Sequence, residues 1–311
     1  MPKFHGVIPP VSTLFTPDFR FDRENQAKLI DRMIEGGVHG LFFLGSNGES
    51  QHMPFEMRLE IAEFCIAHVA GRVPTLIGIG LPSTTESIKL GQHAAENGAD
   101  AVVAINPFYA RLSEDNLYRY FREIADNVDL PLMIYNFPVV TGQDLSPELV
   151  LRLALDCENI IGLKDTVDTL SHIRRAIHVI KAQRPDFLVF AGFDEYLHGT
   201  LIMGGDGVVP ASANFAPQLT VELYEAYRSG DHAAAVAWQQ KLVHTSYMTA
   251  LEAPFYAVVK EGIRMVGFAD ATTVLPPASP ASPESIRTLH DMLVAAGAIE
   301  EQSQLVEKLS A

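Results

Sequence analysis

The chain has 311 residues, 48% of them apolar, which is enough for one large α/β domain or two smaller ones. Its 23 basic and 38 acidic side chains give a net charge of -15 without a basic cluster, so we expect no nucleic-acid partner. No apolar run reaches the roughly 20 residues of a transmembrane helix, and the first residues lack the apolar segment of a signal peptide. The two cysteines, Cys65 and Cys157, argue against a disulfide framework, and we expect a soluble cytoplasmic protein.

Short apolar segments alternate with segments of helical spacing along most of the chain. The predicted strands are residues 7–14, 40–44, 75–80, 101–105, 132–135, 160–164, 188–191 and 208–211. The predicted helices are 24–34, 55–69, 85–95, 114–125, one that begins at 146–148, and then 168–180, 193–202 and 217–227. Several helices begin at Ser or Asp with Pro or Glu in the first turn, a pattern that supplies acceptors for the free N–H groups there.

Eight strand-then-helix units predict a parallel sheet covered by helices, and such a sheet usually closes into a (β/α)8 TIM barrel. A doubly wound sheet is the alternative, but no Gly-x-Gly-x-x-Gly motif follows the first strand. We therefore predict a barrel over residues 1–229 that carries the active site. Residues 230–311 are predicted to be a C-terminal helical appendix with helices at 233–251, 254–265 and 283–296.

The predicted sixth strand ends at Lys164, and Asp165 follows it. A lysine at the end of a buried strand is costly unless it has a function. Burial disfavours the ammonium form and lowers the pKa, so that the free amine can attack a carbonyl and form a Schiff base. The alternative is that Lys164 only ends the strand and pairs with Asp165 or another acid. This segment alone leaves both interpretations open.

Polar residues at the ends of other strands are further candidates, because a barrel of this type gathers its chemistry at the carboxyl ends of its strands. Ser46 follows the second strand in a Gly-flanked turn whose N–H groups can point at a carboxylate. Tyr135 ends the fifth strand, and its phenol can transfer a proton if its pKa is tuned. Each feature alone is more often structural, but together with Lys164 they favour carbonyl chemistry.

Three segments, at residues 45–49 (Gly-Ser-Asn-Gly-Glu), 135–138 (Tyr-Asn-Phe-Pro) and 162–165 (Gly-Leu-Lys-Asp), resemble motifs of one family. This is the dihydrodipicolinate synthase / N-acetylneuraminate lyase family of class I aldolases, and the resemblance extends from about Gly6 to the C-terminal helices. It implies a (β/α)8 barrel with extra C-terminal helices and a homotetramer made of two tight dimers.

The resemblance also implies roles for single residues. Lys164 would form the Schiff base with a 2-oxo acid, and Tyr135 would transfer the proton. Ser46 and the turn that it forms with Asn47 would hold the substrate carboxylate. Residues 107–109 are similar to the Pro-Tyr-Tyr segment of the family, so Tyr109 is implied to reach into the active site of the neighbouring subunit.

The segments after the seventh and eighth strands are implied to bind the rest of the substrate. In sialic acid lyases, the positions of Asp194 and Glu195, in the segment that begins at Gly192, hold the polyol tail. Carboxylates suit this task because they accept hydrogen bonds from hydroxyls. The alternative is that both acids only stabilise the N-terminus of a helix. Val209 and Ala211, on the eighth strand, complete the implied binding surface.

Departures from the family motifs indicate the branch. Val140 stands where dihydrodipicolinate synthases have an arginine for the carboxylate of aspartate semialdehyde, and an aliphatic side chain cannot make that contact. Ala211 stands where sialic acid lyases have a serine, and Asn47 replaces the threonine usual in both groups. Residues 135–142, 164–166 and 211–215 look most similar to the 2-keto-3-deoxy-sugar-acid aldolases. Those enzymes cleave 2-keto-3-deoxygluconate or its pentonate analogue to pyruvate and a hydroxyaldehyde.

Two alternatives to an aldolase of this branch remain open. A 2-keto-3-deoxy sugar acid dehydratase would use the same lysine imine but expel the C4 hydroxyl as water, and a non-catalytic barrel could bind a 2-oxo acid as a sensor. In either enzyme the imine supplies the electrophile, so no metal or organic cofactor is expected. The eleven histidines also lack metal-binding spacing. The prediction is a class I lyase that acts on a small molecule.

Overall fold

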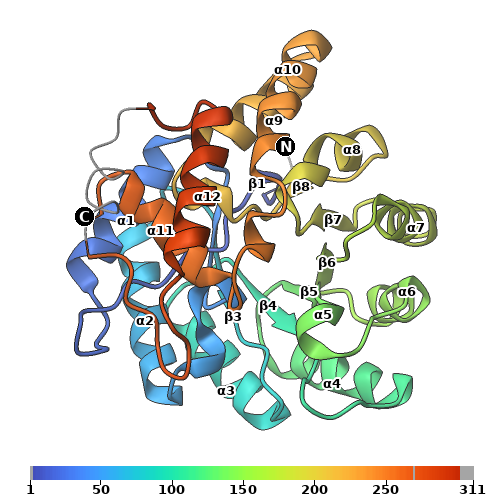
Figure 1. Cartoon of the computed structure of the whole chain (residues 1–311). Helices are drawn as coiled ribbons and strands as arrows, with labels where there is room; N and C mark the ends of the chain where they lie inside the picture. Colours follow the sequence, from blue (N-terminus) through green and yellow to red (C-terminus); the bar gives the residue numbers. More distant parts are fainter. Residues whose placement is uncertain (1–2, 269, 302–311) are drawn as a thin grey trace.

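The computed structural model describes residues 3–268 and 270–301, and this part of the chain contains eight parallel strands (Figure 1). They are β1 (Gly6–Val7), β2 (Leu41–Phe43), β3 (Thr75–Gly78), β4 (Ala101–Ile105), β5 (Leu132–Asn136), β6 (Ile160–Asp165), β7 (Leu188–Ala191) and β8 (Gly207–Val208). Their order is β1-β8-β7-β6-β5-β4-β3-β2. A parallel bridge between Pro10 and Phe42 brings the segment after β1 alongside β2 and closes the barrel. The predicted TIM barrel is confirmed.

The first and last strands are shorter than the segments 7–14 and 208–211 that the sequence suggests. Pro9 and Pro10 follow β1, and Pro210 follows β8 by two residues. Proline has no N–H to donate to a ladder, so regular pairing ends there. The segment after β1 still contacts β2, because Val11 N donates to Phe42 O (2.8 Å) and Phe42 N to Pro9 O (3.0 Å).

Helices surround the strands (Figure 1). They are α1 (Arg23–Glu35), α2 (Phe55–Val69), α3 (Thr84–Glu96), α4 (Glu114–Asn127), α6 (Pro147–Asp156), α7 (Leu170–Lys181), α8 (Leu197–Ile202) and α9 (Gln218–Ser229), with a short α5 (Pro138–Thr141) that the sequence analysis did not predict. The helix starts at Ser or Asp that the sequence pattern predicts are confirmed at four helices, where the side chains of Asp22, Ser83, Ser113 and Ser146 each accept a hydrogen bond from an N–H three residues later.

A layer of apolar side chains fills the inside of the barrel. Alternate residues of each strand point inward, and the buried set includes Ile8, Phe42, Leu76, Val103, Met133, Phe190 and Val209. Lys164 is paired with Phe190 in the sheet and contacts this layer at the carboxyl end of β6. The interior below the lysine is therefore dry.

The C-terminal segment contains α10 (His232–Leu242), α11 (Tyr256–Met265) and α12 (Pro283–Ala295). The prediction of one helix over 233–251 is wrong. The helix ends at Leu242, because Ser246 is extended (ψ 143°) and Tyr247 is left-handed (φ 64°), so the chain leaves the helical path. In the packing, α10 contacts α9, while α11 contacts α12 and the turn after β2. Within the described residues, no helix is long and apolar enough to cross a bilayer.

Candidate active site

A cavity of about 340 Å³ lies at the carboxyl ends of the strands. The predicted site residues that line it are Asn47, Tyr135, Lys164, Gly192, Asp194, Glu195, Val209 and Ala211. Ser46 lines an adjoining cavity of about 480 Å³, which shares Val140, Thr249 and Phe255 with the first. Tyr109 lines neither of them. The fold thus gathers most of the predicted residues at one place.

Lys164 is buried among aromatic rings. Its Nζ lies 4.0 Å from the ring centroid of Tyr135 and 5.1 Å from that of Phe42. Burial lowers the pKa of the amine to about 7, although the charge of Asp194 works in the opposite direction. Lys164 does not pair with Asp165, because that neighbour points to the other face of β6 and binds His172. The interpretation of Lys164 as half of a pair with Asp165 is therefore wrong.

Tyr135 and Ser46 approach each other from β5 and from the turn after β2. The Tyr135 Oη lies 3.5 Å from the Ser46 Oγ. Burial raises the pKa of Tyr135 to about 12, so the phenol is protonated at neutral pH and can donate a proton. Tyr135 is also paired with Lys164 in the sheet, which puts both side chains on the inner face of the barrel.

Asn47 belongs to the short 3-10 turn Ser46–Gly48 and is buried. Its Nδ2 donates to Pro10 O (2.8 Å) and to Ser12 Oγ (2.9 Å), so the side chain fastens the turn to the segment after β1. The first N–H groups of a helical turn have no acceptor within the turn. The backbone N–H groups at Ser46 and Asn47 can therefore donate to a carboxylate, while the Asn47 side chain holds the turn against the segment after β1.

The two acids after β7 have different surroundings. Asp194 is buried, and its two carboxylate oxygens accept hydrogen bonds from Ala211 N (2.9 Å) and Ser212 N (2.8 Å). This carboxylate therefore connects the ends of β7 and β8. Glu195 is partly buried and lines the cavity, and burial raises its pKa to about 7. Glu195 is thus partly protonated at neutral pH.

A glycine is required at position 192. A Cβ built there would lie 1.8 Å from the Thr166 Oγ1, which is closer than any real contact. The close approach leaves the Thr166 hydroxyl on the cavity wall, within hydrogen-bonding reach of the Tyr135 phenol. This hydrogen bond and the one to Ser46 lower the pKa of Tyr135 and so partly oppose the effect of burial.

Comparison with known proteins decides the family. The model of the "Dihydrodipicolinate synthetase family" matches residues 3–296. The chain belongs to this family. The assignment made from the three sequence motifs, and with it the prediction of an aldolase-type lyase, is confirmed.

Two relatives of this family member come from Escherichia coli K12. The chain is 52% identical over 277 residues to "Putative 2-dehydro-3-deoxy-D-gluconate aldolase YagE", covering 89% of this chain and 92% of the relative. It is 47% identical over 297 residues to "Probable 2-dehydro-3-deoxy-D-pentonate aldolase YjhH", covering 96% and 99%. A crystal structure of YagE in complex with pyruvate superposes with a TM-score of 0.93 at 49% identity, covering 95% of this chain and 99% of that one.

Several residues around the cavity of this dihydrodipicolinate synthetase family member were missed by the sequence analysis. Thr166 could have been found, because it lies two residues after Lys164 and so faces the same side. Thr245, Tyr247 and Phe255 also line the cavity, but they come from the C-terminal segment, whose helical periodicity carries no information about what it contacts. Tyr109 is fully exposed, so its implied role in a neighbouring site stays a prediction.

Proposed function

We propose that the protein is a class I aldolase that cleaves a 2-keto-3-deoxy sugar acid reversibly to pyruvate and a hydroxyaldehyde. The observation that carries this proposal is the state of Lys164. Among the described residues that line the cavity it is the one basic residue, it is buried, and its pKa is lowered to about 7. A large fraction is therefore free amine at neutral pH, as imine formation requires.

The first half of the proposed reaction forms the imine. The Lys164 amine attacks C2 of the 2-oxo acid and gives a carbinolamine. Tyr135 donates its proton to the C2 hydroxyl, which leaves as water, and the protonated imine remains. The N–H groups of the turn at Ser46 and Asn47 bind the carboxylate of the substrate in this proposal.

The second half breaks the carbon–carbon bond. A base, either the Tyr135 phenolate left by the first step or the carboxylate of the substrate, removes the proton of the C4 hydroxyl. The electron pair of the C3–C4 bond then moves into the imine, so the aldehyde leaves and an enamine remains. Protonation of the enamine at C3 and hydrolysis of the imine release pyruvate and regenerate Lys164.

The charges around the cavity support a neutral, hydroxyl-rich substrate tail. Apart from Lys164, the carboxylic and basic side chains that line the cavity in the described part of the chain are those of Asp168, Asp194 and Glu195, all acidic. A second carboxylate or a phosphate on the substrate would meet like charges there, whereas hydroxyls find acceptors. Val140, an aliphatic residue, also lines this wall. The printed names of the relatives YagE and YjhH, a gluconate and a pentonate aldolase, fit the same substrate class.

A dehydratase acting on the same imine is the second candidate, and Glu195 is the observation that favours it. A carboxyl group with a pKa raised to about 7 on the cavity wall can protonate a C4 hydroxyl that leaves as water. The two reactions differ in their products. The test is therefore a product analysis.

The experiment is proton NMR after incubation with 2-keto-3-deoxygluconate and, separately, 2-keto-3-deoxyarabinonate. We expect pyruvate with glyceraldehyde from the first and pyruvate with glycolaldehyde from the second. Formation of a dioxo acid or semialdehyde without pyruvate would contradict the aldolase and support the dehydratase.

A covalent test accompanies the product analysis. Borohydride should trap a pyruvate adduct in the wild-type protein and in Lys241→Ala, a change of an exposed lysine on α10, but not in Lys164→Ala. An adduct that persists in Lys164→Ala would contradict the assignment of the nucleophile.

We also propose that the protein is a cytoplasmic homotetramer in which Tyr109 completes the site of a neighbouring subunit. The resemblance to the family implies the assembly. The exposed ring of Tyr109 is available for such a contact, and the two free, buried cysteines fit a reducing compartment.

A further inference from the structure

A buried polar cluster lies behind the two residues proposed for catalysis, on the outer side of β5 and β6. In the sheet, Tyr135 is paired with Lys164, and the next residues, Asn136 and Asp165, are paired with each other. Because successive side chains of a strand point to opposite faces, Asn136 and Asp165 point away from the cavity. Both are fully buried.

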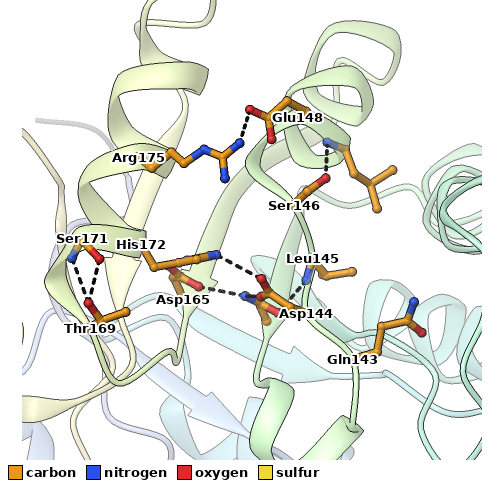
Figure 2. A network of polar contacts seen from close by, with 12 residues as sticks. Gln143, Asp144, Leu145, Ser146, Glu148, Asp165, Thr169, Ser171, His172 and Arg175 are labelled. Atoms are coloured by element: carbon orange, nitrogen blue, oxygen red, sulfur yellow. Dashed lines mark hydrogen bonds and ion pairs between the residues drawn. The ribbon is translucent and has the colours of Figure 1, made fainter.

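Asn136 and Asp165 are joined to two further residues, Asp144 and His172, and we call these four residues the polar clamp. The Asn136 Nδ2 donates to Asp165 Oδ1 (3.0 Å) and to Asp144 Oδ1 (2.8 Å). Its Oδ1 accepts a hydrogen bond from Leu145 N (3.1 Å). The His172 ring lies between the two carboxylates, with Nδ1 2.7 Å from Asp165 and Nε2 3.3 Å from Asp144 (Figure 2).

The charges of the clamp depend on one another. The carboxylates of Asp144 and Asp165 raise the pKa of His172 to about 10, so the ring is positively charged at neutral pH. A buried carboxylate is costly unless it is paired and hydrogen-bonded. Asn136 binds one oxygen of Asp165 and His172 binds the other, so each requirement is met. Loss of the imidazolium leaves one buried oxygen without a partner.

The Lys164 amine lies over the faces of two aromatic rings at the carboxyl end of β6. The centroids of the Tyr135 and Phe42 rings lie 4.0 and 5.1 Å from Nζ. Contacts with ring faces do not fix the direction of the amine. Its direction therefore depends on the position of β6, the strand that carries Lys164. A misplacement of about 1 Å in an active site can lower a rate roughly 100-fold.

We propose that the polar clamp positions Lys164 for imine formation. It fixes the carboxyl end of β6 against that of β5, one residue beyond Lys164 and Tyr135, and thereby holds the amine against the Tyr135 ring. The clamp also ties both strand ends to α7 through His172 and to the loop after α5 through Asp144. Its members do not touch the substrate, so they are positioning residues, and the inference rests on the imine chemistry proposed above.

The test compares His172→Gln with Arg175→Gln. Both residues are on α7, but Arg175 forms an exposed ion pair with Glu148 of α6 (2.8 Å) and leaves the strand ends untouched (Figure 2). The measurement is the rate at which the full-length protein forms the borohydride-trapped pyruvate adduct, together with kcat and KM for the sugar acid.

For His172→Gln we expect adduct formation and kcat to fall by about tenfold with KM changed less than about twofold, while Arg175→Gln stays close to wild type. A merely structural role of His172 predicts a lower melting temperature but a wild-type adduct rate in the folded protein, and that result would overturn the proposal.

A second variant, Asp144→Ala, keeps the proposal testable if His172→Gln does not fold. The Asp144 side chain is 50% exposed, so its removal disturbs the packing little, yet it deletes the contacts to His172 and Asn136. We expect adduct formation to slow about threefold, in line with the modest contribution of a half-exposed charge pair, since Asp165 still holds His172 and Asn136. Adduct formation at the wild-type rate in Asp144→Ala would contradict the positioning role of the polar clamp. A wild-type protein that forms no adduct at all contradicts the proposed function instead, so the two failures are distinct.

Discussion

At the scale of single residues, burial moves two pKa values in directions that suit one reaction. It lowers the pKa of Lys164 to about 7 and raises that of Tyr135 to about 12. In each case the low-dielectric interior favours the neutral form. The result at neutral pH is a free amine beside a protonated phenol, which is the pair of states that imine formation needs at its start.

The lowered pKa of Lys164 gives a direct pH prediction. The nucleophile is the unprotonated amine, so the rate of adduct formation with pyruvate should rise about tenfold per pH unit below pH 7 and level off above it. The ordinary lysine pKa is 10.5, so a rise that continues to pH 10 would contradict the assigned state of Lys164. The measurement is borohydride trapping at a series of pH values, followed by mass spectrometry.

Residues whose chemistry conflicts with a buried position can be predicted from the sequence. Residues whose roles depend on contacts with distant segments are harder to predict. Lys164 and Tyr135 were predicted because polar groups at the ends of buried strands need an explanation, and the structure brings both to one cavity. Asp194 was predicted to bind hydroxyls, yet its oxygens already accept hydrogen bonds from the backbone after β8. The partners of Asn47 lie in a segment far away in the chain, and local pattern contains no signal for such contacts.

At the scale of elements, the turn that follows β2 is fixed by the C-terminal segment. Glu49 ends the turn in a left-handed conformation (φ 60°) and forms a fully buried ion pair with Lys260 of α11. The Glu49 Oε2 also accepts from Leu275 N (2.7 Å), and Lys260 Nζ donates to Thr273 O (2.6 Å). The sequence predicted both α11 and the turn, but their pairing depends on the closed barrel. It could not be derived from either segment alone.

Breaking this buried pair should be costly. Glu49→Gln leaves the Lys260 charge buried without compensation, and we expect the free energy of unfolding to fall by on the order of 3–5 kcal/mol. The double variant Glu49→Gln, Lys260→Met removes both charges and should recover part of the loss. Urea unfolding of the wild type and these variants measures the effect. The control is Lys28→Gln, which breaks the exposed ion pair between Lys28 and Glu24 on α1. If it lowered the free energy of unfolding by a similar amount, the argument from burial would be contradicted.

At the scale of the whole molecule, the cavity is built from the barrel and from the C-terminal segment. Strand ends of the barrel supply Tyr135 and Lys164, while Thr245, Tyr247 and Phe255 of the C-terminal segment supply another part of the wall. The break after α10 has a structural use, because it brings these residues to the cavity. Eight strand-then-helix units could be predicted because a buried parallel sheet leaves a strong local pattern. The course of residues 243–255 could not be predicted, because apolar periodicity indicates a helix but not the residue at which the helix ends.

The proposed assembly predicts complementation between two variants, one without the catalytic lysine and one with a lowered kcat. Tyr109 is fully exposed and left-handed (φ 79°), a conformation that costs a non-glycine residue about 1–2 kcal/mol. If its ring completes a neighbouring site, Tyr109→Ala should lower kcat, whereas Phe19→Ala, which changes another exposed, left-handed aromatic residue, should not.

Mixed assemblies of Tyr109→Ala and Lys164→Ala then contain sites with an intact lysine from one subunit and an intact tyrosine from its neighbour. We expect activity to return on dissociation and reassembly of the mixture, measured as pyruvate release. A mixture that stays inactive although light scattering shows reassembly would place Tyr109 outside the neighbouring site.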